Sequence, residues 1–263
     1  MTAPGSDRSS ELPDYVLDNR AHWDRQSHEW VERGERGWNE EPSWGIWGLP
    51  VAELSPLPDD MTGMRAIELG CGTAYVSAWM ARRGAHCVGI DNSEQQLATA
   101  RRLAEQLEVD LELIHGNAEA VPYPDESFDF AMSEYGAAIW ADPYKWIPEA
   151  WRLLKPGGEL SLLGHHPLVM VTQRREDGDE VTRELLYPYF ELHRVDWRDG
   201  DDRGTEFNLP ISERLLLFDS VGFDVVEFHE VQNPDPKGRK RFGVEPQWGH
   251  EFPSEQAWRL RKR

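Results

Sequence analysis

Residues 64–83 constrain the fold of this chain more than any other stretch. An apolar run, Ala66-Ile67 with Leu69, is typical of a short buried strand. The run stops at Gly70-Cys71-Gly72, and a helical pattern then continues over residues 74–83. A strand, a tight glycine turn and a helix in this order form the first half of a βαβ unit. We therefore expect a parallel α/β sheet with a ligand beside the turn, because glycine accepts positive φ and has no β-carbon.

The next strand indicates which ligand the turn holds. Residues 86–90 are mostly apolar and end at Asp91, about 20 residues past the turn, the separation expected for a carboxylate on a ribose diol. The turn is not G-x-G-x-x-G, because Tyr75 stands where the third glycine would be. It is not a phosphate loop either, since no Gly-Lys-Ser/Thr follows. The sequence predicts a ligand with a ribose that need not carry a pyrophosphate.

Further motifs follow in a fixed order over about 100 residues. Glu68-x-Gly70-x-Gly72 follows a strand, with Asp91 at the end of the next strand. His115-Gly116-Asn117-Ala118-Glu119 precedes Phe128-Asp129-Phe130-Ala131, and residues 153–160 read Leu-Leu-Lys-Pro-Gly-Gly-Glu-Leu. Together these stretches resemble the glycine turn, adenine loop, fourth strand and fifth-strand turn of class I S-adenosylmethionine-dependent methyltransferases. The resemblance covers residues 63–164 and implies a Rossmann-like, doubly wound, mostly parallel seven-stranded sheet.

The same resemblance implies S-adenosylmethionine as the cofactor. The glycine turn would let the backbone approach the methionine part, and Glu68 would orient the turn or reach the cofactor amine. Asp91 would hold the ribose. The family often has aspartate where Asn117 stands, but an amide can accept and donate hydrogen bonds. The cofactor-binding residues that the resemblance implies are Trp23, Glu68, Gly70, Cys71, Gly72, Tyr75, Asp91, Asn92, Asn117, Ala118 and Ser133.

The chain has 263 residues, enough for one large α/β domain with additional elements. An N-terminal polar stretch is rich in Ser, Pro, Gly and Asp and is expected to be a disordered leader. The segments after the fifth strand read as a cap insertion and then the last part of the sheet. We divide the chain into a leader (1–12), a helical tryptophan-rich lid (13–57), a cofactor-binding core (58–164), a cap insertion (165–210) and a C-terminal part of the sheet domain (211–263).

Local signals place several helices. Ser93 with Gln96 is a capping-box pattern before a helix that we expect over residues 94–107. Asp142-Pro143 combines a capping residue with proline at the first helical position. Gly222 fits the C-cap of an amphipathic helix over residues 211–221.

Tryptophan is abundant near the N-terminus. The chain contains 12 tryptophans, including Trp23, Trp38, Trp44 and Trp47. Tryptophan buries a large area and keeps one N–H donor for a polar partner, and small-molecule sites are apolar with a few polar anchors. We expect Trp38, Trp44 and Trp47, with Tyr135, to contact the substrate beneath a lid. The alternative is an N-terminal helix that packs on the sheet edge.

The carboxyl ends of the fourth and fifth strands supply the candidate catalytic groups. The fourth strand ends at Ser133-Glu134-Tyr135, and the fifth ends at His165-His166. Ligands of open α/β sheets bind outside such ends. Either imidazole could be a general base near neutral pH, and Glu134 is the other candidate. The alternative is that these three side chains have structural roles only.

The composition of the chain limits the kinds of partner that we expect. The formal net charge is −20, which disfavours a nucleic acid as the main partner. No apolar run approaches the roughly 20 residues that a membrane span needs, and no secretory signal opens the chain. Two cysteines without zinc spacing predict a reducing, cytoplasmic location and no metal site. The oligomeric state stays open.

We expect methyl transfer to a small, largely apolar molecule, at an oxygen of a phenol, a hydroxyl or a carboxylate such as a fatty acid. The reaction would be an in-line displacement driven by proximity and desolvation. One alternative is a methyltransferase that acts on a protein or another macromolecule. Another is a cofactor-binding protein without turnover. A nicotinamide-dependent dehydrogenase is disfavoured by the missing third glycine.

Overall fold

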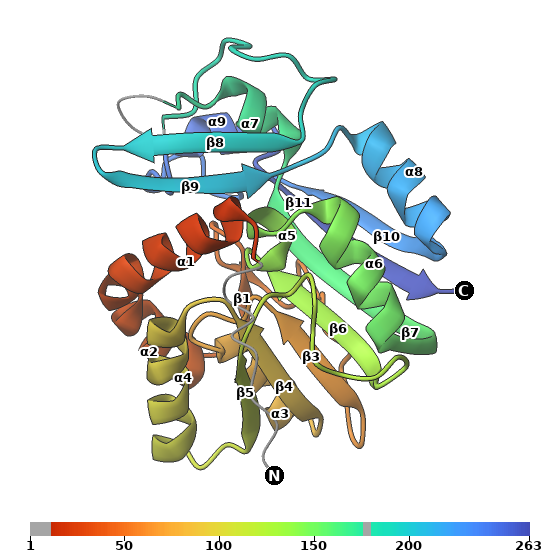
Figure 1. Cartoon of the computed structure of the whole chain (residues 1–263). Coiled ribbons are helices and arrows are strands. Elements are labelled where there is room, and N and C mark those ends of the chain that lie inside the picture. Colours follow the sequence, from red (N-terminus) through yellow and green to blue (C-terminus); the bar gives the residue numbers. More distant parts are fainter. Residues whose placement is uncertain (1–11, 176–179) are drawn as a thin grey trace.

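A seven-stranded sheet forms the centre of the computed structural model, which describes residues 12–175 and 180–263 (Figure 1). The strand order is β10-β11-β7-β6-β3-β4-β5. Neighbouring strands from β7 to β5 are parallel, and β11 and β10 add antiparallel pairs at one edge. The strands are β3 (Arg65–Leu69), β4 (His86–Asp91), β5 (Leu111–His115), β6 (Phe128–Glu134), β7 (Leu154–His165), β10 (Phe223–Val231) and β11 (Glu255–Lys262). The expected doubly wound, mostly parallel fold is confirmed.

Both faces of the sheet are buried, as expected for a parallel sheet. Ile67 of β3 packs on one face in a cluster that contains Trp146 of α6. Its neighbour Ala66 packs on the opposite face in a cluster with Trp79 and Met80 of α3. Successive strand side chains point to opposite faces, so both Ala66 and Ile67 have to be apolar.

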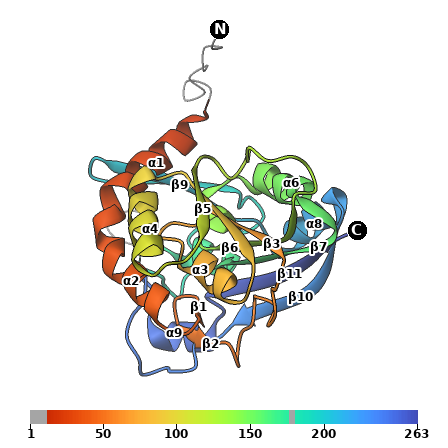
Figure 2. The same cartoon turned by 90° about the horizontal axis from the view of Figure 1, so that it is seen from below.

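Helices cover these faces and extend beyond them. Seen from below, α1, α2 and α4 lie at one edge of the molecule and α8 at the other (Figure 2). No helix in the described ranges is both long and apolar enough to span a bilayer. The helices are α1 (Asp14–Gln26), the 3-10 turn η2 (Ser27–Trp30), α2 (Val31–Asn39), α3 (Tyr75–Arg82), α4 (Glu94–Gln106), α5 (Ala137–Trp140), α6 (Pro143–Leu153), α7 (Pro167–Thr172), α8 (Ile211–Val221) and α9 (Pro246–Glu251).

The predicted helix ends are confirmed. Ser93 Oγ accepts a hydrogen bond from Gln96 N at 3.2 Å, and α4 begins at the next residue. Asp142 Oδ1 accepts from Tyr144 N at 3.1 Å at the start of α6. Gly222 adopts φ 108° after α8, a left-handed conformation in which glycine avoids the steric cost of a β-carbon.

Two small antiparallel pairs lie outside the main sheet. β1 (Ser43–Trp44) pairs with β2 (Leu49–Pro50), and β8 (Arg194–Asp199) pairs with β9 (Asp202–Phe207). Residues 243–263, whose fold could not be assigned from the sequence, form α9 and β11, and β11 lies between β7 and β10. The proposed leader lies outside the described residues except for Leu12. We retain the division of the chain as a proposal.

Candidate active site

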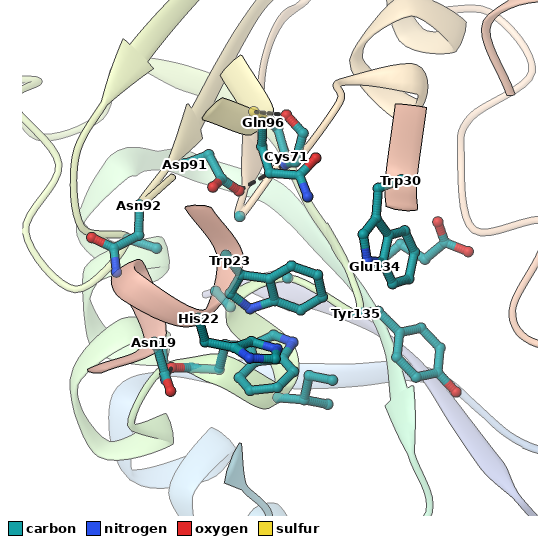
Figure 3. A pocket seen from close by; sticks show the side chains of 18 of the residues that line it. Asn19, His22, Trp23, Trp30, Cys71, Asp91, Asn92, Gln96, Glu134 and Tyr135 are labelled. Carbon is teal, nitrogen blue, oxygen red and sulfur yellow. Dashed lines mark hydrogen bonds between the residues drawn. The ribbon is translucent and has the colours of Figure 1, made fainter. Parts of the chain in front are cut away.

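A cavity of about 490 Å³ lies at the carboxyl ends of the parallel strands. Its floor is the glycine turn after β3 and the residues that follow β4, β5 and β6. Residues of helix α1 and of the β8–β9 hairpin also line it, and Figure 1 shows where these two elements lie. The size lies within the range of small-molecule sites. Figure 3 shows some of the side chains that line it.

The glycine turn leaves room for a ligand. Gly70 and Gly72 have φ of 77° and 52°, and Ala74 has φ of 61°. A β-carbon on Gly70 would lie 2.6 Å from the backbone nitrogen of Ala137, so this position requires glycine. A β-carbon on Gly72 would meet no atom within 4 Å. The backbone is therefore open to the cavity at Gly72 and tightly packed on its other side.

Asp91 connects the turn to helix α4. Its Oδ2 accepts a hydrogen bond from Gly72 N at 2.7 Å, and its Oδ1 accepts from Ser93 N at 2.8 Å. Each carboxylate oxygen can accept a second hydrogen bond, which leaves capacity for two ribose hydroxyls. Burial raises the pKa of Asp91. The remaining acceptor capacity of the Asp91 carboxylate and the open glycine turn fit a ribose-containing cofactor.

Glu68 supports the turn from within the fold. The side chain is buried, and its Oε2 accepts hydrogen bonds from Ser77 N at 2.7 Å and Ser77 Oγ at 2.5 Å. Burial raises its pKa to about 8. Of the two roles that the resemblance left open for Glu68, these contacts favour orientation of the turn. Cys71 and Tyr75, from the same segment, also line the cavity.

The predicted adenine end contains Asn92, Asn117 and Ala118, and all three line the cavity. Asn92 donates from Nδ2 to Val16 O at 2.7 Å, so its side chain fastens helix α1 to the core. Asn117 Oδ1 accepts from Glu119 N at 3.1 Å. This contact leaves Nδ2 as the group that can donate to a ring nitrogen.

The expectation for Ser133 was wrong, because this residue does not reach the cavity. It is fully buried, and its Oγ donates to Leu69 O at 2.8 Å and accepts from Ala138 N at 3.0 Å. These bonds attach α5 to the end of β3. Gly136, three residues later, lines the cavity instead.

The tryptophans expected at the substrate were also placed wrongly. Trp38 is fully buried and donates from Nε1 to Thr73 O at 2.7 Å. Trp44 packs edge-on against Trp79, with ring centroids 5.2 Å apart. Trp47 donates from Nε1 to Ser254 Oγ at 2.7 Å. None of the three is among the cavity-lining residues, because each is anchored in the packing between the N-terminal segment and the sheet.

Other aromatic side chains supply the wall. Trp23, which the sequence placed near the cofactor, lines the cavity together with Trp30, Trp140 and Trp197. Trp23 lies edge-on to Trp30 at 5.4 Å and to Trp140 at 5.1 Å. Sequence reasoning missed Trp140, although it follows β6 closely, and Trp197, which lies in the hairpin.

The candidate catalytic residues differ in their positions. Glu134 lines the cavity, where it accepts hydrogen bonds from Gly45 N at 3.0 Å and Tyr75 Oη at 2.5 Å. Tyr135 also lines it and donates to Glu255 Oε1 at 2.8 Å. Burial raises the pKa of Glu255 to about 7. Both side chains are therefore held by the β1–β2 segment or by β11.

The side chains of the adjacent residues His165 and His166 lie in different surroundings. His165 lines the cavity, and burial lowers its pKa to about 4. His166 is not among the cavity-lining residues. It caps α7, since its Nδ1 accepts from Leu168 N at 3.1 Å, and its Nε2 lies 3.1 Å from Glu230 Oε1. The catalytic role expected for His166 is therefore wrong, because the side chain turns away from the site.

Arg33 is the one arginine or lysine among the described residues that line the cavity. Its guanidinium lies over the rings of Trp30 and Phe242, at 5.2 Å and 5.3 Å from their centroids. No group of three or more metal-ligating side chains is present in the part of the chain that the structure describes. Arg33 is thus the cation available to a ligand carboxylate.

We expect Arg33→Met to weaken binding of S-adenosylhomocysteine about tenfold, because a charge-assisted hydrogen bond is worth about 1.5–3 kcal/mol. Binding of 5′-methylthioadenosine, which lacks the amino-acid carboxylate, should change little. Calorimetric titration of both ligands measures the difference. Equal losses for the two ligands would show that Arg33 does not bind the carboxylate.

Comparison with known proteins places the chain in a family. Residues 67–162 match the family model described as a methyltransferase domain. The demethylmenaquinone methyltransferase of Listeria monocytogenes serovar 1/2a is 36% identical over 105 residues, which are 38% of this chain and 44% of that protein. The ubiquinone biosynthesis O-methyltransferase of Dinoroseobacter shibae is 35% identical over 177 residues, 62% of this chain and 71% of that protein. The chain thus spans less than half the length of the demethylmenaquinone relatives that it matches.

Solved structures share the fold. A putative S-adenosylmethionine-dependent methyltransferase from Listeria monocytogenes superposes with a TM-score of 0.67 at 17% identity, covering 79% of this chain and 93% of that one. The 1,6-didemethyltoxoflavin-N1-methyltransferase of Burkholderia thailandensis, solved with 1,6-didemethyltoxoflavin and S-adenosylhomocysteine, has a TM-score of 0.58 at 14% identity. It covers 100% of this chain, and the match covers 93% of that one.

The doubly wound sheet, the glycine turn and the carboxylate at the end of β4 define a nucleoside-binding α/β protein. The family match and the relatives agree with this architecture. The chain belongs to the class I S-adenosylmethionine-dependent methyltransferases. Its cofactor is S-adenosylmethionine, which supplies a methyl group on a positively charged sulfur when bound.

Proposed function

We propose that this chain transfers a methyl group to an oxygen of a small, largely apolar molecule. The observation that carries this proposal is the wall of Trp23, Trp30, Trp140 and Trp197 that lines the cavity. Aromatic walls with few polar anchors are typical of small-molecule sites. The relative named ubiquinone biosynthesis O-methyltransferase supports oxygen as the acceptor atom.

The charges that line the cavity narrow the acceptor class. Glu29, Glu134, Asp202 and Glu206 line it, and Arg33 is the one arginine or lysine that does so in the described part of the chain. An anionic acceptor would be repelled by these carboxylates, because opposite charges stabilise and like charges destabilise a bound ion. Among the oxygen acceptors, we therefore favour a phenol or neutral hydroxyl over a carboxylate such as a fatty acid.

The chain's own contribution is to position and desolvate the reactants. Residues of helix α1 and of the β8–β9 hairpin line the cavity, and these walls reduce the contact of a bound acceptor with water. A site of this kind favours a small acceptor over a protein or another macromolecule. Both cysteines, Cys71 and Cys87, are buried and free, which supports a cytoplasmic location.

The test is a product analysis with methyl-labelled S-adenosylmethionine. A set of phenols, quinols, fatty acids and amines is incubated with the enzyme, and labelled products are identified by mass spectrometry. We expect labelled methyl ethers of phenols or quinols. Labelled amines alone would contradict oxygen specificity, and cofactor binding without any labelled product would favour a non-enzymatic binder.

A further inference from the structure

A second imidazole lines the cavity at its aromatic wall. His22 of α1 is mostly buried and lines the cavity (Figure 3). Its Nδ1 lies 2.8 Å from Oδ2 of Asp202 in β9. Among the described residues, Nε2 of His22 has no hydrogen-bond partner. A carboxylate acceptor at Nδ1 holds the proton on that nitrogen and leaves a lone pair on Nε2. This is the arrangement of an oriented general base.

Asp202 stays ionised in this pair. Burial of its carboxyl opposes ionisation, but hydrogen bonds from His22 and Arg25 outweigh that effect and hold the pKa of Asp202 below its usual value. Arg25 contacts the other carboxylate oxygen, Oδ1. The carboxylate can therefore stabilise an imidazolium on His22 after it takes a proton.

Asn19 holds helix α1, which carries His22, against strand β9, which carries Asp202. It is buried one turn before His22, and its Oδ1 accepts from Thr205 N at 2.8 Å. Its Nδ2 donates to Thr205 O at 2.9 Å and to Trp140 O at 3.1 Å. One side chain thus joins α1 to β9 and to α5, so the placement of His22 against Asp202 does not depend on the ion pair alone.

The surroundings of His22 suit a flat ring. Trp140 is stacked on the imidazole at 5.8 Å with an interplanar angle of 25°. Trp23 and Trp197 lie edge-on to it at 5.1 Å and 4.9 Å. Aromatic rings prefer such offset and edge-to-face arrangements. A hydroxyl on an aromatic ring that packs against these side chains would find Nε2 of His22 as an acceptor at this wall.

His165 is the less suitable base. Its low pKa makes it a weak proton acceptor, and its nearest carboxylate oxygen, Oε2 of Glu206, lies 3.9 Å from Nε2, beyond hydrogen-bond distance. Its Nδ1 is buried without a partner among the described residues. Glu134 already accepts two hydrogen bonds from the fold.

We propose that this end of the cavity is the acceptor subsite for a hydroxylated aromatic ring, with His22 as the general base and Asp202 as the residue that positions it. The inference rests on the proposed oxygen methylation. The acceptor's O–H bond breaks and its proton moves to Nε2 of His22. The oxygen electron pair forms the new bond to the methyl carbon, while the carbon–sulfur pair stays on sulfur; the imidazolium then loses its proton to water.

Turnover of a phenol found in the labelling screen tests the role of His22. We expect His22→Gln to lower single-turnover methylation by about a hundredfold or more, the range for general base catalysis. A nitro-substituted phenol that is already ionised at the assay pH should lose less than tenfold. Added imidazole should partly restore His22→Ala. The matched control is His193→Gln, which removes another histidine paired with an aspartate, Asp142, outside the cavity and should leave the rate unchanged.

Equal losses for ionised and un-ionised phenols, or a larger loss for His165→Gln than for His22→Gln, would overturn the assignment. A measurement that needs no turnover separates this failure from failure of the proposed function. Nitrogen-15 NMR of the wild type with S-adenosylhomocysteine should show His22 protonated on Nδ1, and Asp202→Asn should remove that preference. A proton on Nε2 in the wild type would refute the general base, whatever the acceptor atom proves to be.

Discussion

Asp91→Ala should lower the affinity for S-adenosylmethionine by about a hundredfold. Two hydrogen bonds from ribose hydroxyls to a carboxylate are worth about 3 kcal/mol together, and 1.4 kcal/mol corresponds to a tenfold change. Fold stability should change by no more than about 1 kcal/mol, since desolvation of this carboxylate, which raises its pKa, offsets its bonds to Gly72 N and Ser93 N. Calorimetric titration and urea unfolding measure the two quantities separately.

Ser93→Ala is the matched control for this substitution. It removes the cap of α4, in which Ser93 Oγ accepts from Gln96 N at 3.2 Å, and leaves the Asp91 carboxylate in place. Loss of this cap should lower the free energy of unfolding by about 1 kcal/mol, with little change in cofactor affinity. Unchanged affinity in Asp91→Ala would mean that the carboxylate only closes the turn and that the ribose binds elsewhere.

The cofactor half of the site could be predicted because its chemistry is local. Gly70, Gly72 and Asp91 act through turn conformation and strand ends, and each property is encoded within a few residues of the chain. The same holds for the caps at Ser93 and Asp142, which a short sequence window shows completely. The strand order follows from the βαβ pattern and the family resemblance.

The acceptor half could not be predicted in the same way. His22 and Asp202 lie far apart in the sequence and meet only because α1 packs on the β8–β9 hairpin through Asn19. In the sequence, His22 is one polar residue in a helical stretch, and Asp202 belongs to an acidic turn. Neither has a local pattern that distinguishes it from a solvated side chain.

The wrong placement of Trp38, Trp44 and Trp47 at the substrate has a different cause. Composition shows that the N-terminal segment must bury large rings, but not against which surface. A β-carbon on Gly34 would lie 2.8 Å from Thr73 Oγ1, and one on Gly37 would lie 2.8 Å from the ring of Tyr75. These glycines bring α2 close to the cofactor turn, and Trp38 is buried there beneath the turn and outside the cavity. Close approach of this kind appears only in the packed structure.

Gly136→Ala should have the largest effect on stability. A β-carbon there would lie 2.1 Å from Gly70 O and 2.6 Å from Leu69 O, and both contacts are backbone atoms that cannot rotate away. Overpacking costs about 1–3 kcal/mol, and rigid neighbours place this site at the upper end. We expect a loss of about 3 kcal/mol in the free energy of unfolding, measured by urea denaturation with linear extrapolation. Because Gly70 must move, affinity for S-adenosylhomocysteine should also fall in the folded protein.

Gly157→Ala separates this clash from ordinary glycine strain. Gly157 has φ of 78°, but a β-carbon there would meet no atom within 4 Å, and the residue does not line the cavity. Alanine in a left-handed conformation costs about 1–2 kcal/mol, so stability should fall less than in Gly136→Ala, with unchanged cofactor affinity. If the two variants lose equal stability and both bind cofactor normally, the contact between Gly136 and Gly70 does not set the shape of the turn. If only Gly136→Ala loses affinity, then the segment after β6 holds the glycine turn open for the cofactor, and the fourth strand shapes the site through its backbone as well as through Glu134 and Tyr135.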